Sequence, residues 1–152
     1  MTVTNINGDA KMKCIQYKAG YKYQLKADYE VAITIKPDAA VDIAFLALTT
    51  DGTLTIRAGY AWDGPSGPTV DTLNFMRGSL VHDALYQLMR ERHLNEAKHR
   101  DAADRLLQRH CIEDGMSAAR AWWVYQGVHR FGKPSADPAN DKPIVRAPKG
   151  CV

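Results

Sequence analysis

The sequence predicts an α+β domain, in which a small antiparallel sheet in the N-terminal third precedes a layer of three helices and an extended C-terminal tail. Apolar residues alternate at period two through Ile56, and after residue 72 they recur at the helical period of 3.6. Composition agrees, because 45% of the 152 residues are hydrophobic and 24% are charged, as in an ordinary globular domain. We assign residues 1–132 to a single domain and residues 133–152 to a Pro-containing tail.

The first third of the chain predicts three to five short strands. Apolar side chains occupy every second position in most of these stretches, and one stretch is a nearly continuous apolar run of strand length. Asp51 and Gly52 form a turn signal before the last of them. The predicted strands fall at residues 21–25, 31–35, 42–49 and 54–56.

The segment 58–69 separates the predicted strands from the predicted helices. It holds three glycines and two prolines, which exclude a helix or a central strand and predict a tightly turned loop. Trp62, Asp63 and Ser66 lie within it, so this loop is one of two segments in which chemistry is to be sought.

Three helices are predicted beyond the loop. Asn95 and Ser117 are suitable N-cap residues for the second and third helix, and Gly115 and Gly132 are suitable stop signals. The apolar stripe of the first helix is wide enough for burial on more than one side. The predicted helices span residues 72–92, 96–113 and 117–130.

Charge and apolar patterning exclude two classes of partner. The net charge is only +3, and residues 133–152 hold four basic and two acidic side chains, so no basic stripe indicates nucleic-acid binding. No apolar run approaches the roughly 20 residues that cross a bilayer. The first residues lack the features of a secretory signal, and the three cysteines show no metal or disulfide spacing, so we expect synthesis in the cytosol.

The first predicted helix carries the second segment of interest, at His82, Asp83 and Tyr86. His82 lies on the shoulder of the apolar stripe, and Tyr86 follows one turn later on the same side. Asp104 lies on the corresponding shoulder of the second helix. If the two stripes pack together, His82 and one or more carboxylates meet beneath the loop that presents Asp63 and Ser66.

Four interpretations of this set stay open. His82, Asp63 and Asp104 could bind a divalent metal such as zinc, or His82 could act as a general base with Asp63, Asp83 and Asp104 as orienting carboxylates. The set could instead be a buried polar cluster that fastens the loop to the helix, or its members could share no contact. Ser66 lacks the strand–turn–helix context of a nucleophile. The candidate binding residues are Trp62, Ser66 and Tyr86.

An ordered series of motifs runs through most of the chain. Its segments are Ala58–Tyr60, Asp63–Gly64 with Ser66, His82–Tyr86, Ala103–Leu106 and Val128–Gly132. In this order they resemble a phage and prophage family catalogued as domain of unknown function 1353. The resemblance covers roughly residues 21–132, and the loop departs from it at Pro65 and at the added Gly67 and Pro68.

The resemblance implies a phage origin, and therefore a place in the virion or the host cytoplasm, but no reaction. Two functions of different class follow as expectations. The first is a virion-associated structural or assembly protein of the tail, neck or head exterior, which contacts other phage proteins through residues 133–152 and has no nucleic-acid or membrane partner. The alternative is a small metal- or His-dependent hydrolase that uses Asp63, His82, Asp83 and Asp104. Self-association into a homo-oligomer is compatible with both.

Overall fold

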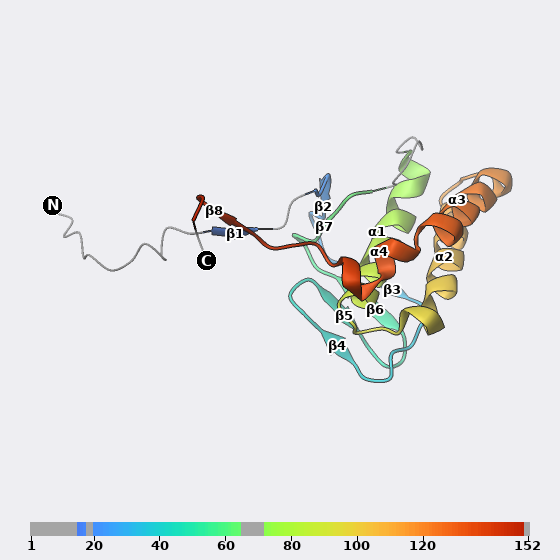
Figure 1. The fold of residues 1–152 in the computed structure, drawn as a ribbon. Coiled ribbons are helices and arrows are strands. Elements are labelled where there is room, and N and C mark those ends of the chain that lie inside the picture. Colours follow the sequence, from blue (N-terminus) through green and yellow to red (C-terminus); the bar gives the residue numbers. More distant parts are fainter. Residues whose placement is uncertain (1–14, 18–19, 65–71, 151–152) are drawn as a thin grey trace, which may run out of the picture. The chain divides into compact units, whose positions relative to one another are not determined.

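The computed structural model describes residues 15–17, 20–64 and 72–150, and it confirms the predicted α+β class. The chain divides into two compact units. One comprises residues 1–20 and 142–152, and the other comprises Tyr21–Asp141. The larger unit contains the sheet and the three long helices (Figure 1).

A four-stranded antiparallel sheet lies in the larger unit, with strand order β3-β6-β5-β4. A separate two-stranded pair, β2 with β7, joins Tyr23 to Trp62 in register. Side chains alternate along β6, where Leu54 and Ile56 are buried and the intervening threonines are half-buried. The strands are β2 (Tyr23–Gln24), β3 (Tyr29–Ala32), β4 (Val41–Asp42), β5 (Leu46–Leu48), β6 (Thr53–Ile56) and β7 (Ala61–Trp62).

The apolar run at 42–49 forms two strands rather than the predicted one. The chain turns between β4 and β5, and Arg57 holds this turn by donating a hydrogen bond to the carbonyl oxygen of Ile43 at 2.5 Å and pairing with Asp42 at 2.7 Å. An arginine that is distant in sequence satisfies the turn, so periodicity alone does not show the break. β7 is a second difference, because it is a short strand within the predicted loop.

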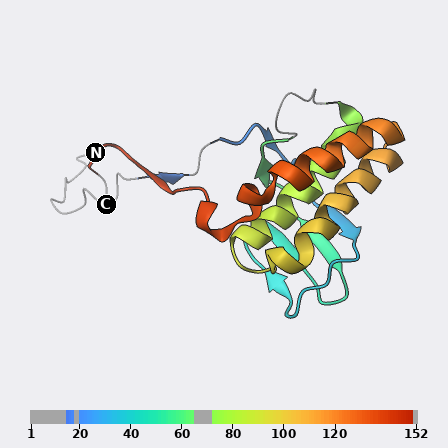
Figure 2. The ribbon, with the colours of Figure 1, turned by 45° about the vertical axis from the view of Figure 1, so that its right-hand side comes forward.

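The three predicted helices are present with nearly the predicted bounds. The side chain of Asn95 accepts a hydrogen bond from the backbone N–H of Lys98, and Ser117 accepts one from Arg120, as N-caps do. The helices lie side by side, with the sheet on one side of the layer (Figure 2). They are α1 (Leu73–Arg90), α2 (Glu96–Glu113) and α3 (Ala118–Phe131).

The core has two parts. Leucines and isoleucines of the sheet pack against α1 and against part of α2, with Leu46, Leu85 and Leu88 fully buried. A smaller cluster joins α1, α2 and α3, and it contains Cys111, which is fully buried and packs as a small apolar residue. Gly78 permits this close packing, because a Cβ there would lie 3.0 Å from Leu107 Cδ1.

The residues that follow Gly132 still belong to the larger unit, as far as Asp141. The short helix α4 (Lys133–Ala136) and the 3₁₀ turn η2 (Pro138–Asn140) replace an extended chain in this stretch, and Ala136 is fully buried. The boundary of the larger unit therefore falls at Asp141 rather than at Gly132. In the smaller unit, β8 (Val145–Ala147) pairs antiparallel with β1 (Ile15–Tyr17).

Candidate functional site

His82 and Asp104 meet at the interface between α1 and α2. The imidazole Nε2 of His82 lies 2.8 Å from Asp104 Oδ1, and both side chains are buried. A carboxylate only accepts, so Nε2 carries the hydrogen of this bond. The residues that helical spacing placed on facing shoulders are thus in contact.

Tyr86 is the second partner of the same carboxylate. Its hydroxyl donates to Asp104 Oδ1 at 2.5 Å, and its ring lies 4.0 Å from the His82 ring, measured between centroids. Burial raises the pKa of the Tyr86 hydroxyl far above its usual range, and the hydrogen bond to Asp104 adds to the effect. The phenol therefore stays protonated and remains a donor.

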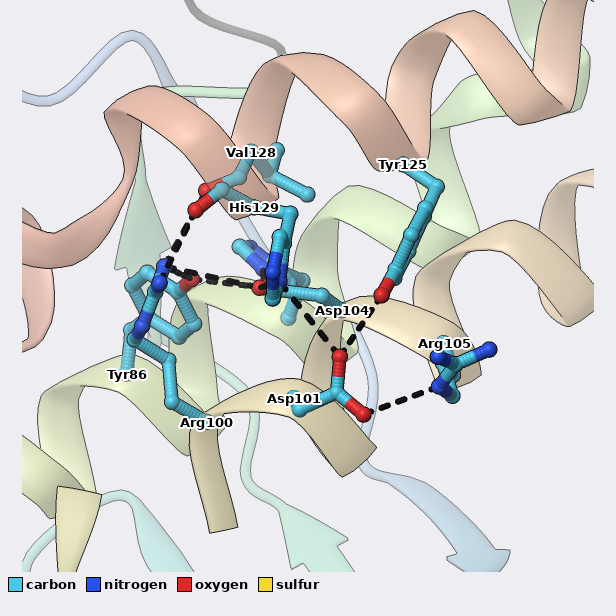
Figure 3. Close-up of polar contacts among 9 residues, drawn as sticks. Tyr86, Arg100, Asp101, Asp104, Arg105, Tyr125, Val128 and His129 are labelled. Carbon is cyan, nitrogen blue, oxygen red and sulfur yellow. Dashed lines mark hydrogen bonds and ion pairs between the residues drawn. The ribbon is translucent and has the colours of Figure 1, made fainter. Parts of the chain in front are cut away.

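Arg100 joins this cluster to the end of α3. Its Nη1 lies 3.5 Å from Asp104 Oδ2 and donates to the carbonyl of Val128 at 3.2 Å, while Nη2 donates to the carbonyl of His129 at 2.8 Å (Figure 3). The last carbonyls of a helix lack partners within the helix. Arg100 donates to two of these carbonyls, of which that of Val128 also accepts from the backbone N–H of Gly132 at 2.8 Å. The charge of Arg100 also suits the negative end of the helix dipole.

Asp101 forms the outer, more exposed layer of the cluster. It accepts hydrogen bonds from the Tyr125 hydroxyl at 2.6 Å and from Arg105 Nε at 2.8 Å, and His129 Nδ1 lies 3.4 Å away (Figure 3). The hydrogen bond from Tyr125 is the main cause that lowers the pKa of Asp101. The outer layer thus places an ionised carboxylate between α2 and α3.

Gly132 allows α1 to approach the end of α3. A Cβ at this position would lie 2.4 Å from the carbonyl oxygen of Val128 and 2.9 Å from the Tyr86 hydroxyl oxygen. The φ angle of Gly132 is −82°, so space rather than backbone conformation requires glycine here. This close contact explains why a glycine follows the last residue of α3.

Asp83 and the segment 61–64 form a second polar contact. A backbone hydrogen bond from Asp63 reaches the Asp83 carboxylate, and the indole nitrogen of Trp62 donates to the Ser79 hydroxyl at 3.2 Å. Trp62 is therefore a buried packing residue that holds β7 on α1. Ser66 lies outside the described residues.

The predicted set therefore divides into two clusters. His82 and Asp83 are neighbours in a helix and point about 100° apart, so His82 faces Asp104 while Asp83 faces Asp63. Among residues 15–17, 20–64 and 72–150, no three His, Cys, Asp or Glu side chains are placed to hold a metal ion. The predicted metal set of Asp63, His82 and Asp104 does not form there.

The cluster also contains residues that were not predicted from the sequence. Arg100 and His129 were not singled out, and neither was Tyr125. Only Arg100 carried a usable signal, because it lies four residues before Asp104 on the same helix face. The contacts of His129 and Tyr125 depend on how α3 packs against α2.

Asp83 makes the stability of the fold depend on pH. Burial raises its pKa from 3.8 to about 6, so between these values the folded chain holds a proton that the unfolded chain releases, and stability falls as pH rises. We expect Asp83→Asn, whose amide oxygen can still accept the bond from Asp63, to raise the free energy of unfolding at pH 7 by about 1–3 kcal/mol. Urea denaturation from pH 4 to pH 8 measures this.

A matched control is Asp28→Asn. Asp28 also accepts a backbone N–H, that of Ala58 at 2.8 Å, but it is exposed. Asp28→Asn should give no gain in stability. If the stability of Asp83→Asn depends on pH in the same way as that of the original chain, ionisation of Asp83 costs no folding free energy.

Comparisons with known proteins leave the fold and the site as the basis for function: no family model, curated protein or solved structure matches the chain. Within the described part of the chain, no helix combines the length and the apolar character needed to cross a membrane. The fold and the site together define a small α+β protein whose polar cluster joins three helices.

Proposed function

We propose that this chain is a phage-encoded, virion-associated structural or assembly protein of the tail, neck or head exterior, rather than an enzyme. The observation that carries the proposal is the position of Asp104, which is fully buried and accepts hydrogen bonds from His82 and Tyr86. A carboxylate in this position holds helices together and offers no open site to a substrate. The motif resemblance supports the phage origin.

The smaller unit supports the same proposal. It pairs β1 with β8, so it joins residues 15–17 and 145–147 in a second compact unit. A small appended unit of this kind is suited to contact a neighbouring protein in an assembly. We therefore place the contact with other phage proteins in residues 142–152, within the tail that begins at residue 133.

The experiment deletes the gene from the phage or prophage that encodes it and complements the deletion with plasmid copies. We expect the intact chain in purified particles at a fixed ratio to the major structural proteins, as measured by quantitative mass spectrometry. The chain truncated after Asp141 should fold but should be at least tenfold depleted from particles. Absence of the intact chain from infectious particles would refute a virion role.

One observation favours a His-dependent hydrolase as the second candidate. A carboxylate orients the imidazole of His82 through Nε2, as in acid–base pairs, and Nδ1 has no hydrogen-bond partner in the described part of the chain. The same complementation distinguishes the two functions. A hydrolase requires that His82→Gln folds normally yet fails to restore infectivity, and that the intact chain is absent from particles.

A further inference from the structure

The outward face of α3 carries large apolar side chains that the core does not use. Trp123 is 69% exposed, Trp122 is 48% exposed and Phe131 is 79% exposed. The opposite side of the helix already packs through Ala121 and Val124. Exposed aromatic side chains gathered on one helix are typical of protein–protein contacts.

Gly127 leaves a gap in this face. It lies four residues after Trp123 and four before Phe131, so the three positions follow one another along the helix surface. No atom lies within 4 Å of the place where its Cβ would be, and its φ angle is not positive. A glycine inside a helix costs about 0.5–1 kcal/mol relative to alanine. Neither backbone conformation nor packing within the described residues accounts for this cost, whereas an incoming side chain would use the space.

The charges of α3 favour an acidic partner. The helix contains Arg120, His129 and Arg130 but no acidic residue. Arg120 turns toward α1 and donates to the Thr72 hydroxyl at 2.9 Å. Arg130 is exposed, and it has no ion pair within the described part of the chain. It lies seven residues after Trp123, which places it on the same face.

Two other occupants fit this face less well. A second copy of the chain would bring a helix without carboxylates against another of the same kind, so arginines would meet arginines. For a single-stranded nucleic acid, parallel aromatic faces would be needed to stack bases. Trp122 and Trp123 instead meet edge to face, at 76° and 5.3 Å between ring centroids.

We propose that the outward face of α3, formed by Trp122, Trp123, Gly127 and Arg130, docks an acidic amphipathic helix of a partner protein. An apolar side chain of that helix would occupy the space over Gly127 beside Trp123, and a carboxylate would pair with Arg130. This is the helix-to-helix recognition in which apolar anchors provide affinity and charges set orientation.

The test titrates the full chain with a designed 18-residue helical peptide that carries leucines on one face and glutamates beside them. The matched probe has lysine at every glutamate position. We expect calorimetric binding of the acidic peptide that weakens as salt rises, and at least tenfold weaker binding of the lysine peptide. Trp123→Ala, Gly127→Leu and Arg130→Glu should each weaken binding of the acidic peptide at least tenfold.

Phe45→Ala is the control variant, because Phe45 is an exposed aromatic residue in the turn between β4 and β5. It should bind like the original chain, and thermal melts should show that all four variants fold. Equal binding of both peptides, no binding at 1 mM peptide, or binding that Trp123→Ala leaves unchanged would overturn the proposal. So would a dimer that Trp123→Ala dissociates, or preferential binding of oligo-dT.

Discussion

Asp104→Ala is expected to lower the free energy of unfolding by about 3–5 kcal/mol, because it removes the fully buried carboxylate on which the helix interface converges. His82 and Tyr86 lose their shared acceptor, and Arg100 loses the nearby negative charge. Each of these groups is then left in the interior without the partner that offset its desolvation. Urea denaturation at pH 7, followed by circular dichroism, measures the change.

Asp101→Ala is the matched control for this prediction. Asp101 lies one turn earlier on α2 and also accepts two hydrogen bonds, but its side chain is half exposed. Its loss should cost less than about 1 kcal/mol, since exposed ion pairs contribute little. If both variants lose the same free energy of unfolding, burial of Asp104 is not the reason that the cluster stabilises the fold.

Arg100→Met is expected to lower the free energy of unfolding by about 2–3 kcal/mol. Methionine retains much of the apolar stem but removes the guanidinium that binds the carbonyls of Val128 and His129. Hydrogen bonds from charged donors contribute about 1.5–3 kcal/mol each, and carbonyls at a helix end can partly replace them with water. The loss should be centred on the last turn of α3, which amide hydrogen exchange can localise.

Arg105→Met is the companion control, on the same helix and with the same change of side chain. Arg105 pairs with Asp101 at the surface and lies 5.0 Å from the centre of the Tyr125 ring. It should leave the unfolding midpoint and the exchange at Val128 and His129 unchanged. Equal effects of the two substitutions would contradict a specific role for Arg100.

The helices could be predicted closely because their signals are local. Asn95 and Ser117 act as N-caps within their own helix, and the apolar stripes follow the helical period. The turn between β4 and β5 could not be predicted, since the group that holds it, Arg57, comes from the segment just after β6. β7 was hidden for the same reason, because it exists only by pairing with β2.

The site could also be predicted only where its contacts follow from a local pattern. The contact between His82 and Asp104 follows from the period of two helices, so their spacing could indicate it. Adjacent positions on α1 diverge, so the backbone hydrogen bond from Asp63 reaches Asp83 while His82 meets Asp104. The role of Arg100 depends on backbone carbonyls of α3, which have no signature in sequence.

The bonds from Arg100 to the end of α3 also bear on how the protein forms during synthesis. Arg100 finds its acceptors 28 and 29 residues later in the chain, and the buried Ala136 follows them. When only α1 and α2 have emerged from the ribosome, Arg100 does not yet have the carbonyls of Val128 and His129 to bind. The helical layer is therefore expected to pack completely only once the chain has emerged to about Ala136.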